Sequence, residues 1–432
     1  MHRIVIVGGG AGGLELATRL GRKLGRRGKA DVTLIDRGHT HVWKPLLHEV
    51  AAGSLDSSID EVSYLAHGKR QGYHFTLGAL GGLDRVEREV ILEPLVDEDG
   101  VEILPERRVP YDYLIIAVGS VSNDFSTPGV HEHCTLLDSL PEAEQFQHHL
   151  LDAFLRLDEQ AKADPGARLG IAIVGAGATG VELSAELYNA ILQLHMYGLH
   201  ELGKEKLDIT LIEASDRILS ALPENIANAA KIELEKFGVR ILTSTQIIEA
   251  TDEGYLTKDG QRIDADLRVW AAGVTGAPVI AKLSDLEISR SNQLVVLPTL
   301  QTSRDERILA IGDCGYLMQE TGRPVPPRAQ SAHQMATTAA KNISALLDNK
   351  PLRDYVYRDR GTLVSFSTFS AVGNLMGNLS GGSMKVEGRV ARIMYISLYR
   401  MHQLTLHGWI HTTLIMLVSR LNRTLRPRLK LH

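Results

Sequence analysis

The sequence is poor in cysteine, which excludes several kinds of structural and redox site. Its 432 residues contain two cysteines, Cys134 and Cys314, far apart and in no C-x-x-C spacing. This argues against a disulfide scaffold, a zinc ribbon and a paired-thiol redox centre. The composition, with 44% hydrophobic and 23% charged residues, is nevertheless that of an ordinary globular protein, and the length allows two or three domains.

The chain also lacks a leader and a long apolar run. An apolar strand begins within the first four residues, so we expect no signal or transit peptide and a protein that faces the cytoplasm, most simply in a bacterium. In the C-terminal part of the sequence the longest apolar run, 414–418, is far shorter than the roughly 20 residues of a bilayer-spanning helix.

Acidic residues are absent from the C-terminal segment 388–432, although the whole chain has a net charge of −5. The basic residues of this segment are Arg389, Arg392, Arg400, Arg420, Arg423, Arg426, Arg428 and Lys430. Its apolar residues at helical spacing are Leu414, Val418, Leu421 and Leu425. Together they predict amphipathic basic helices that lie in an anionic membrane interface, with Trp409 at headgroup depth. A buried dimer interface is the alternative for the same apolar face.

Residues 4–36 have the pattern of a βαβ unit that binds a dinucleotide. Strand 4–7 is followed by a glycine-rich turn, a helix over 14–24 and a second strand that closes with Asp36. The G-x-G-x-x-G positions are filled by Gly8, Gly10 and Gly13. Such glycines allow a tight turn and close approach of a pyrophosphate, and the acid accepts from a ribose hydroxyl. A purely structural turn is the alternative, and the complete order of elements argues against it.

A second copy of this pattern occupies residues 169–213. Strand 169–174 precedes the glycines, helix 181–194 follows them, and strand 209–212 closes with Glu213. Its glycines are Gly175, Gly177 and Gly180. Two fingerprints in full context are a stronger signal than one, which weakens the alternative of a duplicated sheet that binds nothing.

Each unit also has an apolar strand that ends at a glycine and can return to its sheet, 114–119 in the first and 267–273 in the second. A third such run, 308–313, ends in Asp313 and places a carboxylate at the edge where ligands of open α/β sheets bind. A helix cap is the alternative role for Asp313. A β-meander is expected over 73–109 and a long helix over 140–163.

With these motifs the chain resembles the two-dinucleotide flavoprotein oxidoreductases, and specifically the type II NADH:quinone oxidoreductases. The matching stretches are 4–13 with Asp36, 44–51, 117–120, 175–186 with Glu213, 270–273, 310–313, 329–336 and 426–432. The glycine fingerprints are common to the superfamily, whereas the A-Q-x-A-x-Q stretch that begins at Ala329 and the basic tail point to this family.

The resemblance implies an α/β protein with two Rossmann-like, glutathione-reductase-like dinucleotide-binding domains and a C-terminal membrane-associating helical region. The expected parts are 1–125 (FAD-binding domain, first part), 126–165 (connecting helix region), 166–292 (NADH-binding domain), 293–345 (FAD-binding domain, returning part) and 346–432 (C-terminal domain).

The resemblance also implies that the first domain holds FAD and the second binds NADH, with no metal. The expected FAD-binding residues are Gly8, Gly10, Gly12, Gly13, Asp36, Lys44, Gly119, Asp313 and Ala329. Those expected for NADH are Gly175, Gly177, Gly180, Glu182, Glu213 and Gly273. A carboxylate at Glu213 should repel a 2′-phosphate and favour NADH over NADPH, an argument that the nearby Arg217 weakens.

Because there is no cysteine pair beside a flavin, we expect the electrons to leave directly to an external acceptor. The resemblance makes that acceptor a membrane quinone, ubiquinone or menaquinone. Gln330 and Gln334 share one helix face and are expected at the quinone site with Lys385. Together with Glu182, which would reach toward nicotinamide and flavin, they are the expected catalytic residues. The alternatives are ordinary helix polar residues for the glutamines and an acid stabilised by the helix N-terminus for Glu182.

The function expected from the resemblance is therefore electron transfer from NADH to quinone in a respiratory chain, without proton pumping. The enzyme would be peripheral on the cytoplasmic face of the bacterial inner membrane and would contact its anionic surface. A homodimer is a further expected partner arrangement, and no nucleic acid would be bound. The alternatives are a soluble NADH-dependent flavoprotein reductase of a protein acceptor such as ferredoxin, and a flavin-binding redox sensor without turnover.

Overall fold

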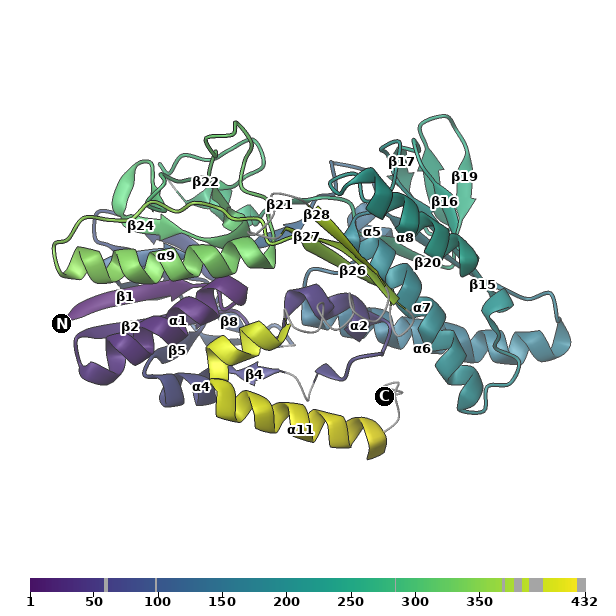
Figure 1. Cartoon of the computed structure of the whole chain (residues 1–432), viewed down its shortest axis with the longest axis horizontal. Helices are drawn as coiled ribbons and strands as arrows, with labels where there is room; N and C mark the ends of the chain where they lie inside the picture. Colours follow the sequence, from purple (N-terminus) through teal and green to yellow (C-terminus); the bar gives the residue numbers. More distant parts are fainter. Residues whose placement is uncertain are drawn as a thin grey trace.

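A computed structural model describes residues 1–57, 61–97, 99–283, 285–366, 370–376, 383–387 and 399–425. Figure 1 shows two α/β units side by side, with a small sheet between them and a helix along the lower edge. Both predicted βαβ units are present. The fold class predicted from the sequence is therefore confirmed, while the parts of the tail at 388–398 and 426–432 lie outside the described residues.

The first unit is built on a six-stranded sheet of order β23-β24-β11-β1-β2-β5, parallel except for β23. Its strands are β1 (His2–Val7), β2 (Ala30–Asp36), β5 (His74–Leu77), β11 (Tyr113–Ile116), β23 (Gln301–Thr302) and β24 (Asp305–Ala310). The helices α1 (Ala11–Lys23) and α9 (Ala329–Leu347) lie side by side against it (Figure 1). Ile4, Ile6 and Ile115 are completely buried, as expected of central parallel strands covered on both faces.

The second unit repeats this plan in a five-stranded parallel sheet of order β13-β20-β14-β15-β16. Its strands are β13 (Thr135–Leu136), β14 (Leu169–Val174), β15 (Leu207–Ile212), β16 (Arg240–Leu242) and β20 (Leu267–Trp270). The helices are α6 (Leu140–Ala163), α7 (Ala178–Met196) and α8 (Glu224–Lys236). The region 126–165, expected as a connection, supplies β13 and α6 to this unit, because the apolar face of α6 packs into the second core.

Short elements complete the two units. The expected meander gives an antiparallel sheet of β6 (Leu80–Asp84), β7 (Glu89–Leu92) and β10 (Arg107–Pro110), and the hairpin β8 (Leu95–Val96) and β9 (Glu102–Leu104). The other short elements are β3 (Thr40–His41), α2 (Leu47–Ala51), β4 (Val62–Ser63), α4 (Tyr64–Gln71), α5 (Val130–His133), β17 (Ile247–Ala250), β18 (Gly254–Thr257), β19 (Arg262–Asp264), β22 (Leu294–Val295) and β25 (Gly315–Tyr316). The antiparallel pair β12 (Ser120–Ser122) and β21 (Val274–Gly276) joins one unit to the other.

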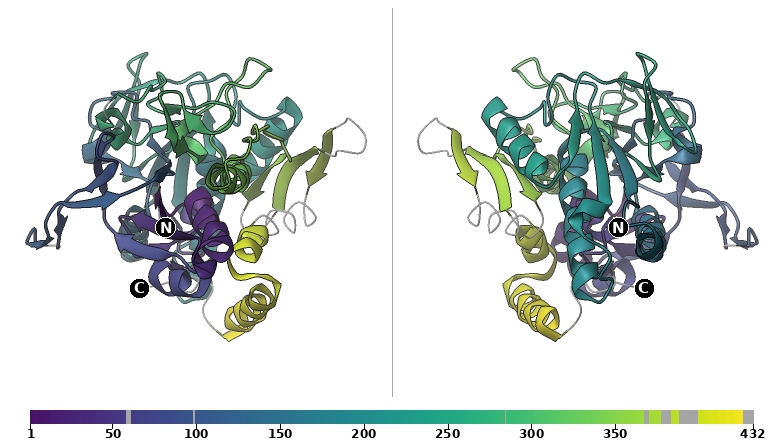
Figure 2. Two further views of the ribbon diagram at one scale, coloured as in Figure 1. Left: turned by 90° about the vertical axis from the view of Figure 1, so that its left-hand side faces the viewer. Right: turned by 90° about the vertical axis from the view of Figure 1, so that its right-hand side faces the viewer.

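The C-terminal region contains a small sheet and two helical segments. The sheet is antiparallel and consists of β26 (Thr362–Phe366), β27 (Ser370–Met376) and β28 (Ser383–Glu387). Residues 399–407 form a helical segment, which we call the anchor segment, and α11 (Trp409–Leu425) follows it. In the side views the sheet stands beside the two units and α11 lies at the lower edge (Figure 2). Within the described ranges, no helix combines the length and apolar character needed to cross a bilayer.

Candidate active site

The first glycine loop is shaped by close backbone approach. Gly8 has φ +104°, and a Cβ atom there would lie 2.3 Å from the carbonyl oxygen of Ala117. A Cβ atom on Gly13 would lie 1.8 Å from the carbonyl oxygen of Gly8, so α1 packs directly on the turn. No atom lies within 4 Å of the position that a Cβ atom of Gly10 would take. The loop therefore leaves room for a ligand at the N-terminus of α1, where an anion is stabilised by free N–H groups and the helix dipole.

Asp36 is held beside this loop at the end of β2. One of its carboxylate oxygens accepts from the Gly9 amide at 2.6 Å and the other from the Gly38 amide at 2.8 Å. Burial raises the pKa of Asp36, and these two backbone hydrogen bonds act against that rise. The carboxylate is thus fixed at the edge of the loop, where the βαβ pattern places a ribose.

The second loop repeats the first almost atom for atom. Gly175 has φ +102°, and a Cβ atom on Gly180 would lie 2.0 Å from the Gly175 carbonyl oxygen. The position of a Cβ atom on Gly177 is open. Glu213 takes the place of Asp36, since its carboxylate accepts from the Ala176 amide at 2.9 Å and from the Ser215 amide at 2.8 Å.

Three further residues expected at the first site meet at the carboxyl edge of its sheet. Ser120 Oγ donates to Asp313 at 2.9 Å, and Lys44 Nζ donates to the Ser120 carbonyl at 3.0 Å and to Asp138 at 3.2 Å. Burial raises the pKa of Asp313, while the Ser120 hydroxyl and the charge of Lys44 oppose the rise. Gly119, directly before Ser120, has φ +75° and open space at its Cβ position. A chain of polar groups and bare backbone therefore extends from the loop along the sheet edge.

Other predicted residues lie at the margins of these sites. Gly12 faces α9, because a Cβ atom there would lie 3.3 Å from the Ala332 carbonyl oxygen. Ala329 begins α9. Gly273, with φ +64°, follows β20, and a Cβ atom on it would meet the ring of Phe125 at 2.9 Å. Lys385 lies in β28 opposite Asn374, and the structure describes its backbone only.

Glu182 lies at the meeting point of three parts of the molecule. It is the fifth residue of α7 and is buried. Its Oε1 accepts from the Ser365 amide of β26 at 3.0 Å, and its Oε2 lies 3.7 Å from Nδ1 of His48 on α2. Burial lowers the pKa of His48 to about 4, so this imidazole is neutral at physiological pH. Glu182 is therefore oriented by neighbouring groups and is not a freely solvated helix N-terminal acid.

Gln330 and Gln334 project from one face of α9, as their spacing predicts. Both amides contact the backbone of residues 358–361: Gln334 donates to and accepts from Arg358 at 2.9 and 3.0 Å. Gln330 donates to the Gly361 carbonyl at 3.3 Å and accepts from the Arg360 amide at 3.2 Å. In this structure the two glutamines hold the segment that leads into β26, and a quinone would have to share or replace these contacts.

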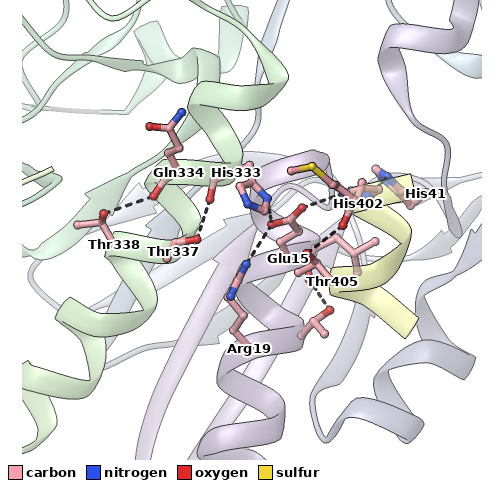
Figure 3. Close-up of polar contacts among 12 residues, drawn as sticks. Glu15, Arg19, His41, His333, Gln334, Thr337, Thr338, His402 and Thr405 are labelled. Carbon is pink, nitrogen blue, oxygen red and sulfur yellow. Dashed lines mark hydrogen bonds and ion pairs between the residues drawn. The ribbon is translucent and has the colours of Figure 1, made fainter. Parts of the chain in front are cut away.

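The sequence analysis missed a buried polar cluster centred on Glu15 of α1. Its carboxylate contacts His333 of α9 and His402 of the anchor segment, and His402 in turn contacts His41 (Figure 3). The spacing of the sequence repeat could have indicated this glutamate. Glu15 follows Gly10 by the same interval as Glu182 follows Gly177, so the two glutamates occupy equivalent positions of the repeat.

Comparisons with known proteins agree with this geometry. The family model described as pyridine nucleotide-disulphide oxidoreductase matches residues 2–336. The chain is 51% identical, over the full length of both proteins, to a type II NADH:quinone oxidoreductase of Haemophilus influenzae. It is 28% identical to one of Staphylococcus aureus, over 88% of this chain and 91% of that protein.

Among solved structures, the fold is similar to NDH2 of Plasmodium falciparum in complex with NADH. The TM-score is 0.81 and the identity 18%, with 99% of this chain and 100% of that chain covered. The full-length coverage means that the C-terminal region, as well as the two nucleotide units, belongs to the shared architecture.

Proposed function

We propose, on the premise that this chain belongs to the type II NADH:quinone oxidoreductases, that it oxidises NADH with a bound FAD and reduces a membrane quinone without pumping protons. The place in a respiratory chain, on the cytoplasmic face of a bacterial inner membrane, belongs to the same proposal. The observation that carries it is the pair of glycine loops, each with an acid held at its edge by two backbone amides.

The first unit would hold FAD. The open positions at Gly10 and Gly119 fit a ligand that lies against bare backbone, and Asp36 and Asp313 are carboxylates at the two ends of that surface. Lys44 is near enough to Asp313 to moderate its charge. A flavin bound there would supply the chemistry, since it can accept a hydride from a nicotinamide and give up electrons to a quinone. The protein supplies the cradle and excludes water.

The second unit would bind NADH. Gly177 leaves the N-terminus of α7 open for a pyrophosphate, and Glu213 would accept from the adenosine ribose. Arg217, which the sequence left as a competing partner for a 2′-phosphate, donates to the Ser220 carbonyl at 2.9 Å. Its other terminal nitrogen, Nη1, is buried without a hydrogen-bond partner among the described residues. The carboxylate of Glu213 accepts directly from the Ala176 amide of the loop, and on this contact we base the preference for NADH over NADPH. Glu182, buried between α7, α2 and β26, is the side chain we assign to the contact between nicotinamide and flavin.

Quinone reduction would take place near Gln330 and Gln334, which lie on α9 beside α1. Their amides can donate to quinone carbonyls if they release part of the backbone of 358–361. The side chain of Lys385, outside the described atoms, remains the third member of this proposed site.

Membrane attachment would involve α11. Its exposed apolar side chains are Trp409, Ile410, Leu414, Met416, Leu417 and Val418, and the tryptophan is 73% exposed. A helix with such residues and no acid is suited to lie in the membrane interface, with basic residues near anionic headgroups. The same face could instead meet a second copy of the chain, and the two arrangements are compatible.

The decisive experiment is purification of the full chain from membranes, followed by an absorption spectrum and rapid-mixing kinetics. We expect a yellow protein whose flavin absorbance is bleached by NADH and restored by a short-chain quinone. A colourless protein that stays colourless after refolding with FAD would contradict the proposal. Bleaching by NADH with reoxidation by ferredoxin alone would favour the soluble reductase, and bleaching without turnover would favour the redox sensor.

Membrane attachment can be tested separately by deleting 408–432, which keeps the anchor segment in place. We expect the shortened enzyme to leave the membrane fraction on washing and still to be bleached by NADH, because each glycine loop is held by an acid of its own unit. Fractionation followed by flavin measurement gives both readouts. A shortened enzyme that stays with the membrane would show that α11 is not the attachment.

A further inference from the structure

A buried chain of polar contacts connects the first glycine loop to the anchor segment. Nδ1 of His41 lies 3.0 Å from the Gly9 carbonyl oxygen, and Nε2 of His41 lies 3.0 Å from Nε2 of His402. Nδ1 of His402 lies 2.9 Å from Oε1 of Glu15 (Figure 3). Glu15 is 1% and His402 3% exposed. We call Glu15, His402 and His41 the carboxylate–imidazole chain.

Counting hydrogens shows that the carboxylate–imidazole chain needs an additional proton. The chain contains three contacts, and each contact is a hydrogen bond only if one of its two atoms carries a hydrogen to donate. The Gly9 carbonyl and an ionised Glu15 carry none, whereas each neutral imidazole carries one. Two hydrogens cannot complete three hydrogen bonds. The contacts of His41 and His402 are therefore all satisfied only when one more proton is present.

The surroundings decide where that proton resides. Burial lowers the pKa of His41 to about 3, so His41 stays neutral. Burial acts to raise the pKa of Glu15, but hydrogen bonds from His333 and His402 outweigh it and lower the pKa below the ordinary value. The indole of Trp43 lies against the His402 ring with centroids 4.1 Å apart, an arrangement that favours an imidazolium. Burial also lowers the pKa of His402, while the hydrogen bond and the charge of Glu15 act against that fall. Because His41 is the less favourable of the two imidazoles, the additional proton belongs to the His402–Glu15 pair.

Other titratable or charged groups face the carboxylate–imidazole chain from each neighbouring element. His333 of α9 lies 2.6 Å and Arg19 of α1 lies 3.7 Å from Oε2 of Glu15 (Figure 3). The others are His67 of α4, which acts on His41, His407 of the anchor segment, which faces His402, and Tyr64, whose hydroxyl donates to the Gly9 carbonyl at 2.9 Å. His333 has a hydrogen of its own for its contact, and Arg19 is always charged, so neither supplies the missing proton to the three contacts.

The anchor segment is otherwise attached through its C-terminal carbonyls. Arg22 of α1 donates to the carbonyls of Thr405 at 3.2 Å and Leu406 at 2.7 Å, and Gln71 of α4 donates to Leu406 at 3.3 Å. These bonds fix the end of the segment but do not reach the glycine loop. A second route from the segment to Gly9 passes from the Leu406 carbonyl through His67, Tyr73 and Tyr64. The carboxylate–imidazole chain differs from this route because its contacts need an additional proton.

We propose that Glu15, His402 and His41 share one stored proton, and that this proton fastens the anchor segment to the first glycine loop. The three residues are positioning residues: they hold the loop that would bind FAD in register with the segment that precedes α11. The inference rests on the proposed function only for the identity of the loop's ligand, because the link itself joins described residues.

The test is Glu15→Gln in the full-length holoenzyme, read by hydrogen–deuterium exchange of the amides of 399–407. A glutamine amide can donate to Nδ1 of His402, which lets two neutral imidazoles complete all three bonds without a stored proton. In this variant His402 must stay neutral to complete the three bonds, whereas in the wild type the His402–Glu15 pair completes them by taking up the stored proton as the pH falls. Because burial lowers the pKa of His402, the proton is taken up below the ordinary histidine value of about 6.5. We therefore expect the ratio of amide protection of 399–407 in the wild type to that in the variant to rise roughly tenfold as the pH falls from alkaline values to well below that value, the size of one charged hydrogen bond.

At the alkaline end the variant should protect the segment at least as well as the wild type. A packing role for Glu15 predicts the opposite, a variant that is looser by the same factor at every pH, and that result would overturn the proposal. The ratio of the exchange rates of the two proteins at each pH cancels the intrinsic pH dependence of amide exchange. The readout requires neither quinone nor turnover, so a failure here is separate from a failure of the proposed function.

Glu186→Gln is the matched control. Glu186 is another buried acid of a nucleotide helix, and it accepts from Ser54 at 2.6 Å, away from the anchor segment. We expect it to leave the exchange of 399–407 unchanged at both pH values. If Glu15→Gln does not fold, ¹⁵N-histidine spectra of the wild type decide the matter: His402 should titrate as an imidazolium while His41 stays neutral with hydrogen on Nδ1. Two neutral imidazoles across the whole range would rule the proposal out.

Discussion

The two nucleotide units are nearly identical at their glycine loops. They differ in the contacts of the glutamate that lies about one turn into the following helix. In both, the third glycine packs on the carbonyl of the first, and an acid at the end of the next strand accepts from the amide that follows the first glycine. Glu15 and Glu182 then occupy the same position on the two helices but contact different parts of the C-terminal region. Glu15 contacts His402 of the anchor segment, and Glu182 contacts the backbone of β26.

This difference shows which features the ligand constrains and which are free to change. The loop is fixed by the need to bring backbone to a pyrophosphate, so both copies keep it. The glutamate lies on the helix beyond the loop, where Glu15 contacts His402 of the anchor segment and Glu182, which we assign to the nicotinamide contact, also accepts from the Ser365 amide of β26. A duplicated domain can thus keep its binding geometry while the equivalent buried acid acquires two separate roles.

The largest expected effect comes from Gly13→Ala set against Gly180→Ala. The added Cβ atoms would lie 1.8 and 2.0 Å from backbone carbonyl oxygens, so each helix must shift away from its turn. We expect loss of bound flavin in the first variant, and retained flavin with loss of NADH bleaching in the second. Flavin content after gel filtration and rapid-mixing kinetics measure both. Gly10→Ala, at an open position, serves as the control for folding, and equal flavin loss in both glycine variants would refute separate roles for the units.

Acidification should lower the unfolding free energy through His48, the histidine beside Glu182. The pKa of His48 is lowered by burial to about 4, whereas in the unfolded chain it is close to the ordinary 6.5. Proton uptake then favours the unfolded state as pH falls from 6.5 toward 4. The wild type should lose up to about 3 kcal/mol of unfolding free energy over this window that His48→Gln does not lose. Denaturant unfolding at several pH values measures the difference, and parallel curves for the two proteins would contradict it.

A smaller effect is expected from Glu213→Gln. Neutralising the carboxylate removes a charged hydrogen-bond acceptor from the proposed ribose site and the repulsion of a 2′-phosphate. The KM for NADH should rise about tenfold and the preference over NADPH should fall by a similar factor, with flavin content unchanged. Asp36→Asn is the matched change in the first unit and should lower flavin retention instead. Unchanged discrimination between the two nucleotides would remove Glu213 from this role.

The sequence predicted the parts of the molecule that depend on local pattern. The strands and helices of both units follow from apolar periodicity, and the turns follow from glycines at positions where the backbone packs too closely for a side chain. It did not predict the partners of Gln330 and Gln334, because residues 358–361 reach α9 only through the tertiary fold. The Glu15 cluster was missed for a similar reason: His402 is 387 residues away along the chain.

The attachment of the C-terminal region has a mechanical consequence. β26 is tied to the second unit through Glu182, and the anchor segment is tied to the first through Glu15 and Arg22. A single stretch of chain therefore spans the divide between the units and continues directly into α11. Since the anchor segment leads directly into α11, a force on α11 would act first on the first unit, at the helix that carries its glycine loop.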